Sequence, residues 1–253
     1  MKNFENKVAV ITGAGSGIGE STAIEFLKNN FTVVLAGRRS KNLEDAAKKS
    51  KEYSKNALIV PTDVSKIESV TNLFETIKKK YGRLDVLFNN AGKSNPSTPL
   101  DELSIEDWHS VVDVNLNGMF YCAKSAFTLM KQQSPIGGRI INNGSISAYT
   151  PRPNSIAYTS TKHATTGLTK SISLDGRKFS IVCSQIDIGN ALTDLAKQIS
   201  IGVQQADGSI KPEPMMEATD VANAVLNIAK LPLSCNIQFM TIMASNMPFI
   251  GRG

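Results

Sequence analysis

Residues 8–19 read VAVITGAGSGIG, an apolar run that ends in closely spaced glycines and leads into a stretch with the pattern of a helix. Glycines at the end of a strand let the backbone approach a ligand closely, and the following helix offers unpaired N–H groups and a positive dipole to a pyrophosphate. Glycines also serve ordinary tight turns and close helix contacts. The stretch therefore predicts a dinucleotide cradle, with a plain turn as the alternative.

Short apolar runs alternate with longer amphipathic stretches along the rest of the chain. We expect strands at 8–11, 32–36, 57–60, 84–88, 139–141, 181–186 and 237–243, and helices at 17–29, 40–54, 66–80, 104–133, 157–174 and 217–230. This alternation is typical of a parallel sheet with helices on both faces and right-handed crossovers. The predicted fold class is α/β: a doubly wound, Rossmann-type, seven-stranded and mostly parallel sheet.

The chain has 253 residues, of which 41% are hydrophobic and 20% charged, and it contains no internal repeat or linker. Length and composition predict a single domain over residues 1–253. The connection at residues 189–216 is unusually long for such a domain, which is typical of a substrate lid, a binding loop or a disordered segment. We expect a lid, since this connection follows a strand at the edge where open α/β sheets bind ligands.

Several classes of protein are disfavoured by composition. No run of about 18 apolar residues predicts a membrane span, and the first residues lack the apolar core of a signal peptide, so we expect a cytoplasmic protein. The cysteines and histidines are too few and scattered for a disulfide framework or a metal site: Cys122, Cys183, Cys235, His109 and His163. The net charge of +6 comes from lysines dispersed along predicted helices, so we expect no nucleic-acid partner.

The residues after the second strand indicate which cofactor is used. In dinucleotide folds an acidic residue at this place binds the ribose of NAD, whereas an arginine accommodates the 2′-phosphate of NADP. Here Arg38 and Arg39 follow Gly37, so we expect NADP(H) rather than NAD(H). A solvated loop arginine is the alternative, above all for Arg39. Asp63, after the third strand, could accept a hydrogen bond from the adenine amino group or cap a turn.

Tyr158 and Lys162 lie four residues apart in a predicted helix, so their side chains share one face. A neighbouring ammonium favours the phenolate, which suits the tyrosine to general acid or base chemistry. The pair alone is a common coincidence. It gains weight from Ser145, thirteen residues before Tyr158 and just after the fifth strand, and from Asn115 in the fourth helical segment.

These pieces together resemble a classical short-chain dehydrogenase/reductase (SDR) over essentially the whole chain, in order and in spacing. The matching segments are Thr12 to Gly19, Asp63-Val64, Asn89-Asn90-Ala91-Gly92, Asn115, Ser145 and Tyr158-x-x-x-Lys162. One departure is Ile188-Gly189, where the family usually has Pro-Gly; this leaves the contact with nicotinamide open, although Thr193 follows at the usual offset.

The resemblance implies four catalytic residues. Tyr158 would exchange the proton with the substrate oxygen, Ser145 would hydrogen-bond that oxygen, and Lys162 would favour the phenolate and bind the nicotinamide ribose. Asn115 would link Lys162 to solvent through a water, held by its distorted backbone or its side chain. The cofactor-binding residues that we expect are Gly13, Ser16, Gly17, Ile18, Gly19, Arg38, Arg39, Asp63, Val64, Asn90, Ala91, Gly92, Tyr158, Lys162, Ile188 and Thr193.

The expected function is that of an NADP(H)-dependent oxidoreductase which acts on a carbonyl or a secondary alcohol, the CH–OH group of the donor. A non-catalytic NADP-binding or sensing module on the same fold is the alternative, and a purely structural subunit is a third possibility. Lys93 and Arg152 near the predicted site suggest an anionic or polar substrate, unless they are solvated loop charges. Asn143 either faces the pocket or pairs locally. The likeness also implies a homodimer or homotetramer formed through residues 115–133, 157–174 and the last strand.

Overall fold

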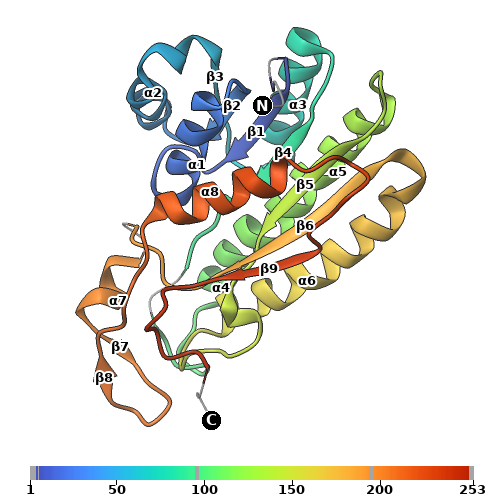
Figure 1. Cartoon of the computed structure of the whole chain (residues 1–253). Coiled ribbons are helices and arrows are strands. Elements are labelled where there is room, and N and C mark those ends of the chain that lie inside the picture. Colours follow the sequence, from blue (N-terminus) through green and yellow to red (C-terminus); the bar gives the residue numbers. More distant parts are fainter. Residues whose placement is uncertain (1–3, 5, 95–96, 194–195, 251–253) are drawn as a thin grey trace.

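The computed structural model describes residues 4, 6–94, 97–193 and 196–250. Its main sheet has seven strands in the order β3-β2-β1-β4-β5-β6-β9, and every neighbouring pair is parallel (Figure 1). The strands are β1 (Val8–Thr12), β2 (Thr32–Gly37), β3 (Ala57–Pro61), β4 (Val86–Asn89), β5 (Gly138–Asn143), β6 (Ile181–Ile188) and β9 (Phe239–Ile242). The predicted doubly wound α/β sheet is therefore confirmed.

The helices cover both faces of this sheet. The helices that the structure describes are α1 (Gly17–Lys28), α2 (Ser40–Lys49), α3 (Ile67–Tyr81), α4 (Ile105–Val112), α5 (Gly118–Gln132), α6 (Ile156–Gly176), α7 (Lys197–Ile201) and α8 (Ala218–Ala229), of which α7 lies away from the sheet. Short 3-10 turns lie at η1 (Lys51–Asn56), η3 (Ile146–Ala148) and η4 (Arg177–Phe179), and a π-helical turn at η2 (Asp113–Asn117). Local capping explains some ends: Ser104 Oγ accepts a hydrogen bond from the Asp107 N–H before α4.

Two predicted helices differ from the structure. The helix expected at 40–54 ends at Lys49 and continues as the turn η1. The helix expected at 104–133 is divided into α4, the π-helical turn η2 and α5. The π-helical turn spans only Asp113–Asn117 and has α-helix directly before and after it, so the sequence pattern predicts one continuous helix.

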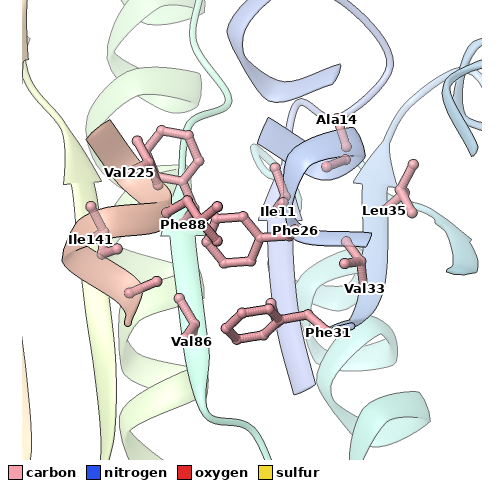
Figure 2. Packing of buried hydrophobic residues seen from close by; sticks show 14 of the residues in the cluster. Ile11, Ala14, Phe26, Phe31, Val33, Leu35, Val86, Phe88, Ile141 and Val225 are labelled. Carbon is pink, nitrogen blue, oxygen red and sulfur yellow. The ribbon is translucent and has the colours of Figure 1, made fainter. Parts of the chain in front are cut away.

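Alternate residues of the central strands pack into two cores, one on each side of the sheet. Ala9 and Ile11 of β1 face the core formed with α1, α2 and α8, whereas Val8 and Val10 face the core formed with α3 and α5. Figure 2 shows the first core, where Phe26 of α1, Phe88 of β4 and Val225 of α8 gather beside Ile11. Covering both faces leaves the carboxyl ends of the strands as the open edge.

The segment expected to be a lid has secondary structure of its own. Residues 189–216 include α7 and an antiparallel hairpin of β7 (Val203–Gln204) and β8 (Ile210–Lys211), which extend from the body of the molecule at the lower left of Figure 1. Two residues of the segment, 194–195, lie outside the described part of the chain. In the part that is described, no helix has both the length and the apolar character of a membrane span.

Candidate active site

A cavity of about 1150 Å³ opens at the carboxyl edge of the sheet, between the glycine turn and residues 189–216. Most of the residues that the sequence predicts for the site line it: Gly13, Ser16, Gly17, Ile18, Arg38, Arg39, Asp63, Val64, Asn90, Ala91, Gly92, Ser145, Tyr158, Lys162, Ile188 and Thr193. Gly19 and Asn115 do not line the cavity, and both lie directly behind lining residues. The fold thus brings distant motifs to one site.

The glycine turn after β1 is held in place by the end of β4. Thr12 Oγ1 accepts hydrogen bonds from the N–H groups of Asn90 and Ala91, each at 2.9 Å, and Asn90 Nδ2 donates to the Thr12 carbonyl. Gly13 has a φ of +68°, which favours glycine. At Gly19 a Cβ atom would lie 2.2 Å from the Gly13 carbonyl oxygen, so helix α1 can approach the turn this closely only without a side chain there.

The geometry of this turn fits a dinucleotide. Ser16, Gly17 and Ile18 line the cavity at the start of α1, where the first N–H groups of a helix have no partner within the helix. Arg38 and Arg39 line the same cavity at the end of β2, and both are exposed. Neither makes an ion pair with another residue that the structure describes, so both guanidiniums are available to a phosphate.

Some lining residues at this end of the cavity have no counterpart among the predicted ones: Gly15, Asn42, Leu43 and Thr62. Gly15 belongs to the glycine-rich stretch from which the cradle is predicted, whereas no local pattern marks Asn42, Leu43 and Thr62, which follow β2 and β3. Asp63 also lines the cavity, but its Oδ1 already accepts hydrogen bonds from the N–H and the hydroxyl of Ser65, at 3.1 and 2.7 Å. Of the two roles expected for Asp63, turn capping is therefore the one that these hydrogen bonds show.

Tyr158 and Lys162 lie on one face of α6, as their spacing predicts. The Lys162 Nζ atom is 5.4 Å from the centroid of the Tyr158 ring and donates a 2.6 Å hydrogen bond to the carbonyl oxygen of Asn143, at the end of β5. Lys162 is only 6% exposed, so its ammonium depends on these protein partners rather than on bulk water. Ser145 follows two residues after Asn143 and lines the same cavity.

Asn143 has both of the roles that the sequence left open. Its side-chain amide donates a 2.9 Å hydrogen bond to Asn90 Oδ1, which ties the end of β5 to the end of β4. The residue also lines the cavity. Its backbone carbonyl also accepts the hydrogen bond from Lys162. The end of β5 therefore supports both Asn90 at the end of β4 and the ammonium of Lys162 on α6.

Asn115 lies in the π-helical turn η2 and supports the loop after β4. Its Oδ1 accepts a hydrogen bond from the Lys93 N–H at 2.8 Å, and its Nδ2 donates to the Lys93 carbonyl at 2.9 Å and to Thr161 Oγ1 at 3.3 Å. The side chain is thereby engaged. The widened turn also distorts the backbone at Asn115, and both routes expected for a water, through this backbone or through the side chain, remain predictions.

A buried carboxylate that the sequence prediction missed lies beneath Ser145. Asp187 of β6 is fully buried, and its Oδ1 accepts hydrogen bonds from the Ser145 N–H at 3.0 Å and from Gln185 Nε2 at 2.7 Å. Its Oδ2 accepts the Tyr149 hydroxyl at 2.8 Å. Burial and the Asp187 carboxylate raise the pKa of Tyr149 to about 12. The sequence signal that could have identified Asp187 is an acidic residue within a strand that is buried on both faces.

Ile188, which replaces the usual proline, ends β6 and pairs with Ile242 of β9. The next N–H, of Gly189, donates a 2.8 Å hydrogen bond to the Ile242 carbonyl, so the parallel ladder continues past this position. Thr193 returns to the glycine turn: a Cβ atom on Gly17 would lie 3.0 Å from the Thr193 methyl group. The beginning of the 189–216 segment is thus fastened both to the sheet and to the cradle.

The two cations expected to attract an anionic or polar substrate have different partners, a carboxylate for Arg152 and a neutral hydroxyl for Lys93. The Arg152 guanidinium donates hydrogen bonds to Glu213 Oε2 at 2.6 Å and to Asn190 Oδ1 at 2.9 Å, and Asn190 Nδ2 donates to the same carboxylate oxygen at 2.7 Å. Burial alone would raise the pKa of Glu213, but hydrogen bonds from Asn190 and Gln205 and the charge of Arg152 outweigh it and lower that pKa. Lys93 Nζ donates to Ser110 Oγ at 3.0 Å.

Within the described ranges, no three or more His, Cys, Asp or Glu side chains gather in a way that could hold a metal ion.

Comparisons with known proteins agree with this geometry. Residues 7–203 match the family model described as short chain dehydrogenase. A 3beta-hydroxysteroid dehydrogenase of Mediterraneibacter gnavus is 36% identical over 204 residues, which cover 81% of this chain and 73% of that protein.

Two solved structures are also similar. A 3-ketoacyl-(acyl-carrier-protein) reductase from Brucella melitensis, complexed with NADH, has a TM-score of 0.84 and 26% identity, with 96% of this chain and 99% of that one covered. An alcohol dehydrogenase from the archaeon Thermococcus sibiricus, complexed with 5-hydroxy-NADP, has a TM-score of 0.80 and 26% identity, with 96% and 98% covered. Because the family model matches residues 7–203, which are most of this chain, the chain belongs to the short-chain dehydrogenase/reductase family of oxidoreductases.

Proposed function

We propose that this protein is an NADP(H)-dependent oxidoreductase that transfers a hydride between nicotinamide and a carbonyl or secondary alcohol substrate, with Tyr158 as general acid and base. The observation that carries this proposal is that Tyr158, Lys162 and Ser145 line the same cavity as the glycine turn and the two arginines after β2. The bound dinucleotide would supply or accept the hydride, and the protein would orient the reactants.

The side chains of this site suit proton transfer to an oxygen atom. In the reducing direction the Tyr158 hydroxyl gives its proton to the substrate oxygen, and in the oxidising direction the phenolate takes it back. The Ser145 hydroxyl donates a hydrogen bond to the oxygen on which negative charge develops, and its position is fixed by the bond from its N–H to Asp187. The Lys162 ammonium, near the Tyr158 ring, stabilises the phenolate.

Lys162 and Asn115 complete the set of four catalytic residues. Lys162 would also donate to the ribose hydroxyls next to nicotinamide, and its bond to the Asn143 carbonyl holds the ammonium at the carboxyl end of β5, beside the cavity. Asn115 binds a water through the backbone of the π-helical turn, and this water connects Lys162 with solvent for reprotonation.

The decisive test is Tyr158→Phe. Removal of the general acid is expected to lower kcat by roughly 10²- to 10⁴-fold, while the Kd for NADPH stays within a few-fold of the wild-type value. Turnover is measured by NADPH absorbance against a panel of ketones and secondary alcohols, and binding by calorimetry. Undiminished turnover in the variant would refute the assignment of Tyr158. Tight NADPH binding without turnover in the wild type would favour the non-catalytic sensing module instead.

We propose NADP(H) rather than NAD(H) because Arg38 and Arg39 are exposed at the cavity and free of ion pairs in the described part of the chain. A guanidinium binds a phosphate through charge-assisted, bidentate hydrogen bonds, and no carboxylate stands at Gly37 to Arg39 to repel it. Solved relatives are complexed with NADH in one case and with an NADP derivative in another, so the choice rests on these two residues.

We further propose that residues 1–253 act as a single NADP-binding domain in which residues 189–216 cover the substrate. Asn190, Ile199 and Gln204 of this segment line the cavity, which supports a lid. Limited proteolysis with and without NADPH tests it: protection of this segment by NADPH is expected, and cleavage that NADPH does not alter would count against a lid.

For the assembly we propose a homodimer or homotetramer in the cytoplasm that binds neither nucleic acid nor membranes. Phe120 of α5 and Phe239 of β9 support an oligomer, because these aromatic side chains are 45% and 37% exposed on the elements that the family uses for contact. Light scattering should give a multiple of the 27.3 kDa chain mass, and a mass of one chain would overturn the proposal. Cell fractionation tests the location.

A further inference from the structure

We propose that the part of the substrate that lies under residues 189–216 is an apolar hydrocarbon group, and that Ile210 of β8 selects for it. This inference rests on the proposed oxidoreductase function and names the substrate class for the same site: ketones and secondary alcohols with an extended hydrocarbon group beside the reactive carbon. It concerns one wall of the cavity. Lys93 and Arg152 line the cavity from other segments, the loop after β4 and the loop before α6, and can bind polar parts of the same substrate.

The side chains of residues 189–216 are sorted by charge. None of the described residues of this segment that line the cavity is charged, and the apolar ones among them include Ala196, Ile199 and Ile210. The charged side chains that the structure describes in this segment lie outside the lining: Asp207 and Lys211 are each 64% exposed, and Glu213 is buried. The segment therefore turns an uncharged and largely apolar face toward the substrate.

The register of the hairpin places Ile210 on the side of the cavity. Gln204 pairs with Ile210 across the two antiparallel strands, so their side chains share one face, and Lys211 is on the opposite face. Gln204 and Ile210 line the cavity, whereas Lys211 does not. Gln204 Oε1 accepts a 3.2 Å hydrogen bond from Asn154 Nδ2, four residues before Tyr158. The face with Ile210 is thus fastened to the loop that leads to the general acid.

Ile210 is 75% exposed although it lines the cavity. A Cβ atom on Gly202 would lie 2.8 Å from Ile210 Cγ2, so the glycine lets this side chain lie close to the backbone of the segment on one side. Its remaining surface is open to a ligand. Covering such a surface with hydrocarbon is favourable in proportion to the area removed from water, whereas a polar group placed there would lose hydration without gaining a partner.

The first experiment measures binding and needs no turnover. 2-Butanone, 2-hexanone and 2-octanone are titrated by calorimetry into the full chain saturated with NADP⁺. This mixture cannot react, because neither the ketone nor the oxidised cofactor supplies a hydride. We expect the Kd to fall by roughly two- to fourfold for each added methylene group. Equal Kd values across the series, or no binding of 2-octanone, would overturn the inference.

Three variants test whether Ile210 is the selecting residue. Ile210→Thr keeps a branched side chain suited to a strand, and it should reduce the ratio of the Kd for 2-butanone to that for 2-octanone by roughly threefold or more. Ile210→Leu keeps the apolar surface and should leave this ratio within about twofold of the wild-type value. Ile201→Thr is the matched control, because Ile201 belongs to the same segment and is 72% exposed but does not line the cavity. A ratio that Ile210→Thr does not change, or that Ile201→Thr lowers equally, contradicts the role of Ile210.

A turnover measurement separates this inference from the proposed function. The kcat/KM for reduction of 2-octanone by NADPH, relative to that for 2-butanone, should follow the ratio of Kd values in the wild type and in each variant. Absence of turnover with every ketone, together with the expected dependence of binding on chain length, would refute the oxidoreductase proposal and leave the apolar face intact. Equal turnover of short and long ketones would support an oxidoreductase and refute the proposed substrate class.

Discussion

Arg38 is the residue on which cofactor preference depends in the proposed function. It is exposed at the cavity, and no ion pair engages it within the described part of the chain. Arg38→Ala should raise the KM for NADPH by roughly tenfold or more and leave the KM for NADH almost unchanged, because only NADPH carries the 2′-phosphate. Steady-state kinetics with both cofactors measures the effect. Equal losses for NADH and NADPH would mean that Arg38 does not contact that phosphate.

Gly19 is a second residue whose role can be tested directly. A Cβ atom there would lie 2.2 Å from the Gly13 carbonyl oxygen and 2.6 Å from Asn90 Nδ2, so helix α1 would have to move away from the glycine turn. Gly19→Ala should lower the free energy of unfolding by about 1–3 kcal/mol and weaken NADPH binding. The matched control is Gly167→Ala in α6, where a Cβ atom meets nothing within 4 Å. That variant should gain about 0.5–1 kcal/mol from helix propensity. Urea unfolding and calorimetry distinguish them.

At the scale of elements, a carboxylate joins the beginning of β1 to the beginning of β4. Asp85 accepts hydrogen bonds from the Val8 N–H at 2.9 Å, from Lys7 Nζ at 2.9 Å and from both Nε and Nη2 of Arg83. Burial alone would raise the pKa of Asp85, but the hydrogen bonds from Arg83, Val8 and Lys7 outweigh it and hold that pKa below its usual range. The ionised carboxylate is therefore the form that the fold stabilises.

The pH dependence of stability follows from the sign of this shift. A group with a lowered pKa contributes stability above its unfolded pKa, and this contribution is lost as the pH falls through the folded pKa. Asp85→Asn should reduce the free energy of unfolding by about 1–3 kcal/mol at pH 7, and the difference from the wild type should shrink below about pH 4. Urea unfolding across this range measures it. A difference that is constant with pH would contradict the role of the charge.

The points at which helices begin and end depend on tertiary contacts with other parts of the fold. The apolar pattern predicts helix throughout 104–133, yet the chain forms a π-helical turn at η2, where Asn115 bonds to the backbone of Lys93. Gly118, directly after that turn, packs closely on Val64, where a Cβ atom would lie 2.8 Å from Cγ2. Periodicity reports which face of a segment is apolar, whereas such tertiary contacts decide where a turn is widened.

At the scale of the whole molecule, stability depends on the cores on both faces of the sheet. Phe88 of β4 is fully buried in the core that Figure 2 shows, beside α1 and α8. Phe88→Ala should lower the free energy of unfolding by about 3–5 kcal/mol, since it removes buried apolar contacts and leaves a cavity. Leu100→Ala, at a side chain that is 70% exposed and outside the segments expected to form the oligomer, should change it by less than about 0.5 kcal/mol. Similar losses in both variants would refute this description of the core.

The sequence by itself determined the parallel sheet, the glycine turn and the shared face of Tyr158 and Lys162, because each of these depends on spacing within one or two consecutive elements. Only the tertiary structure decided which loops meet. Arg152 and Glu213 are 61 residues apart, and Ser145 and Asp187 are 42 apart. Their pairing arises because parallel strands bring all their carboxyl ends to one edge, where the following loops pack against each other. Burial then forces each charge there to find a partner, and no local pattern specifies which one.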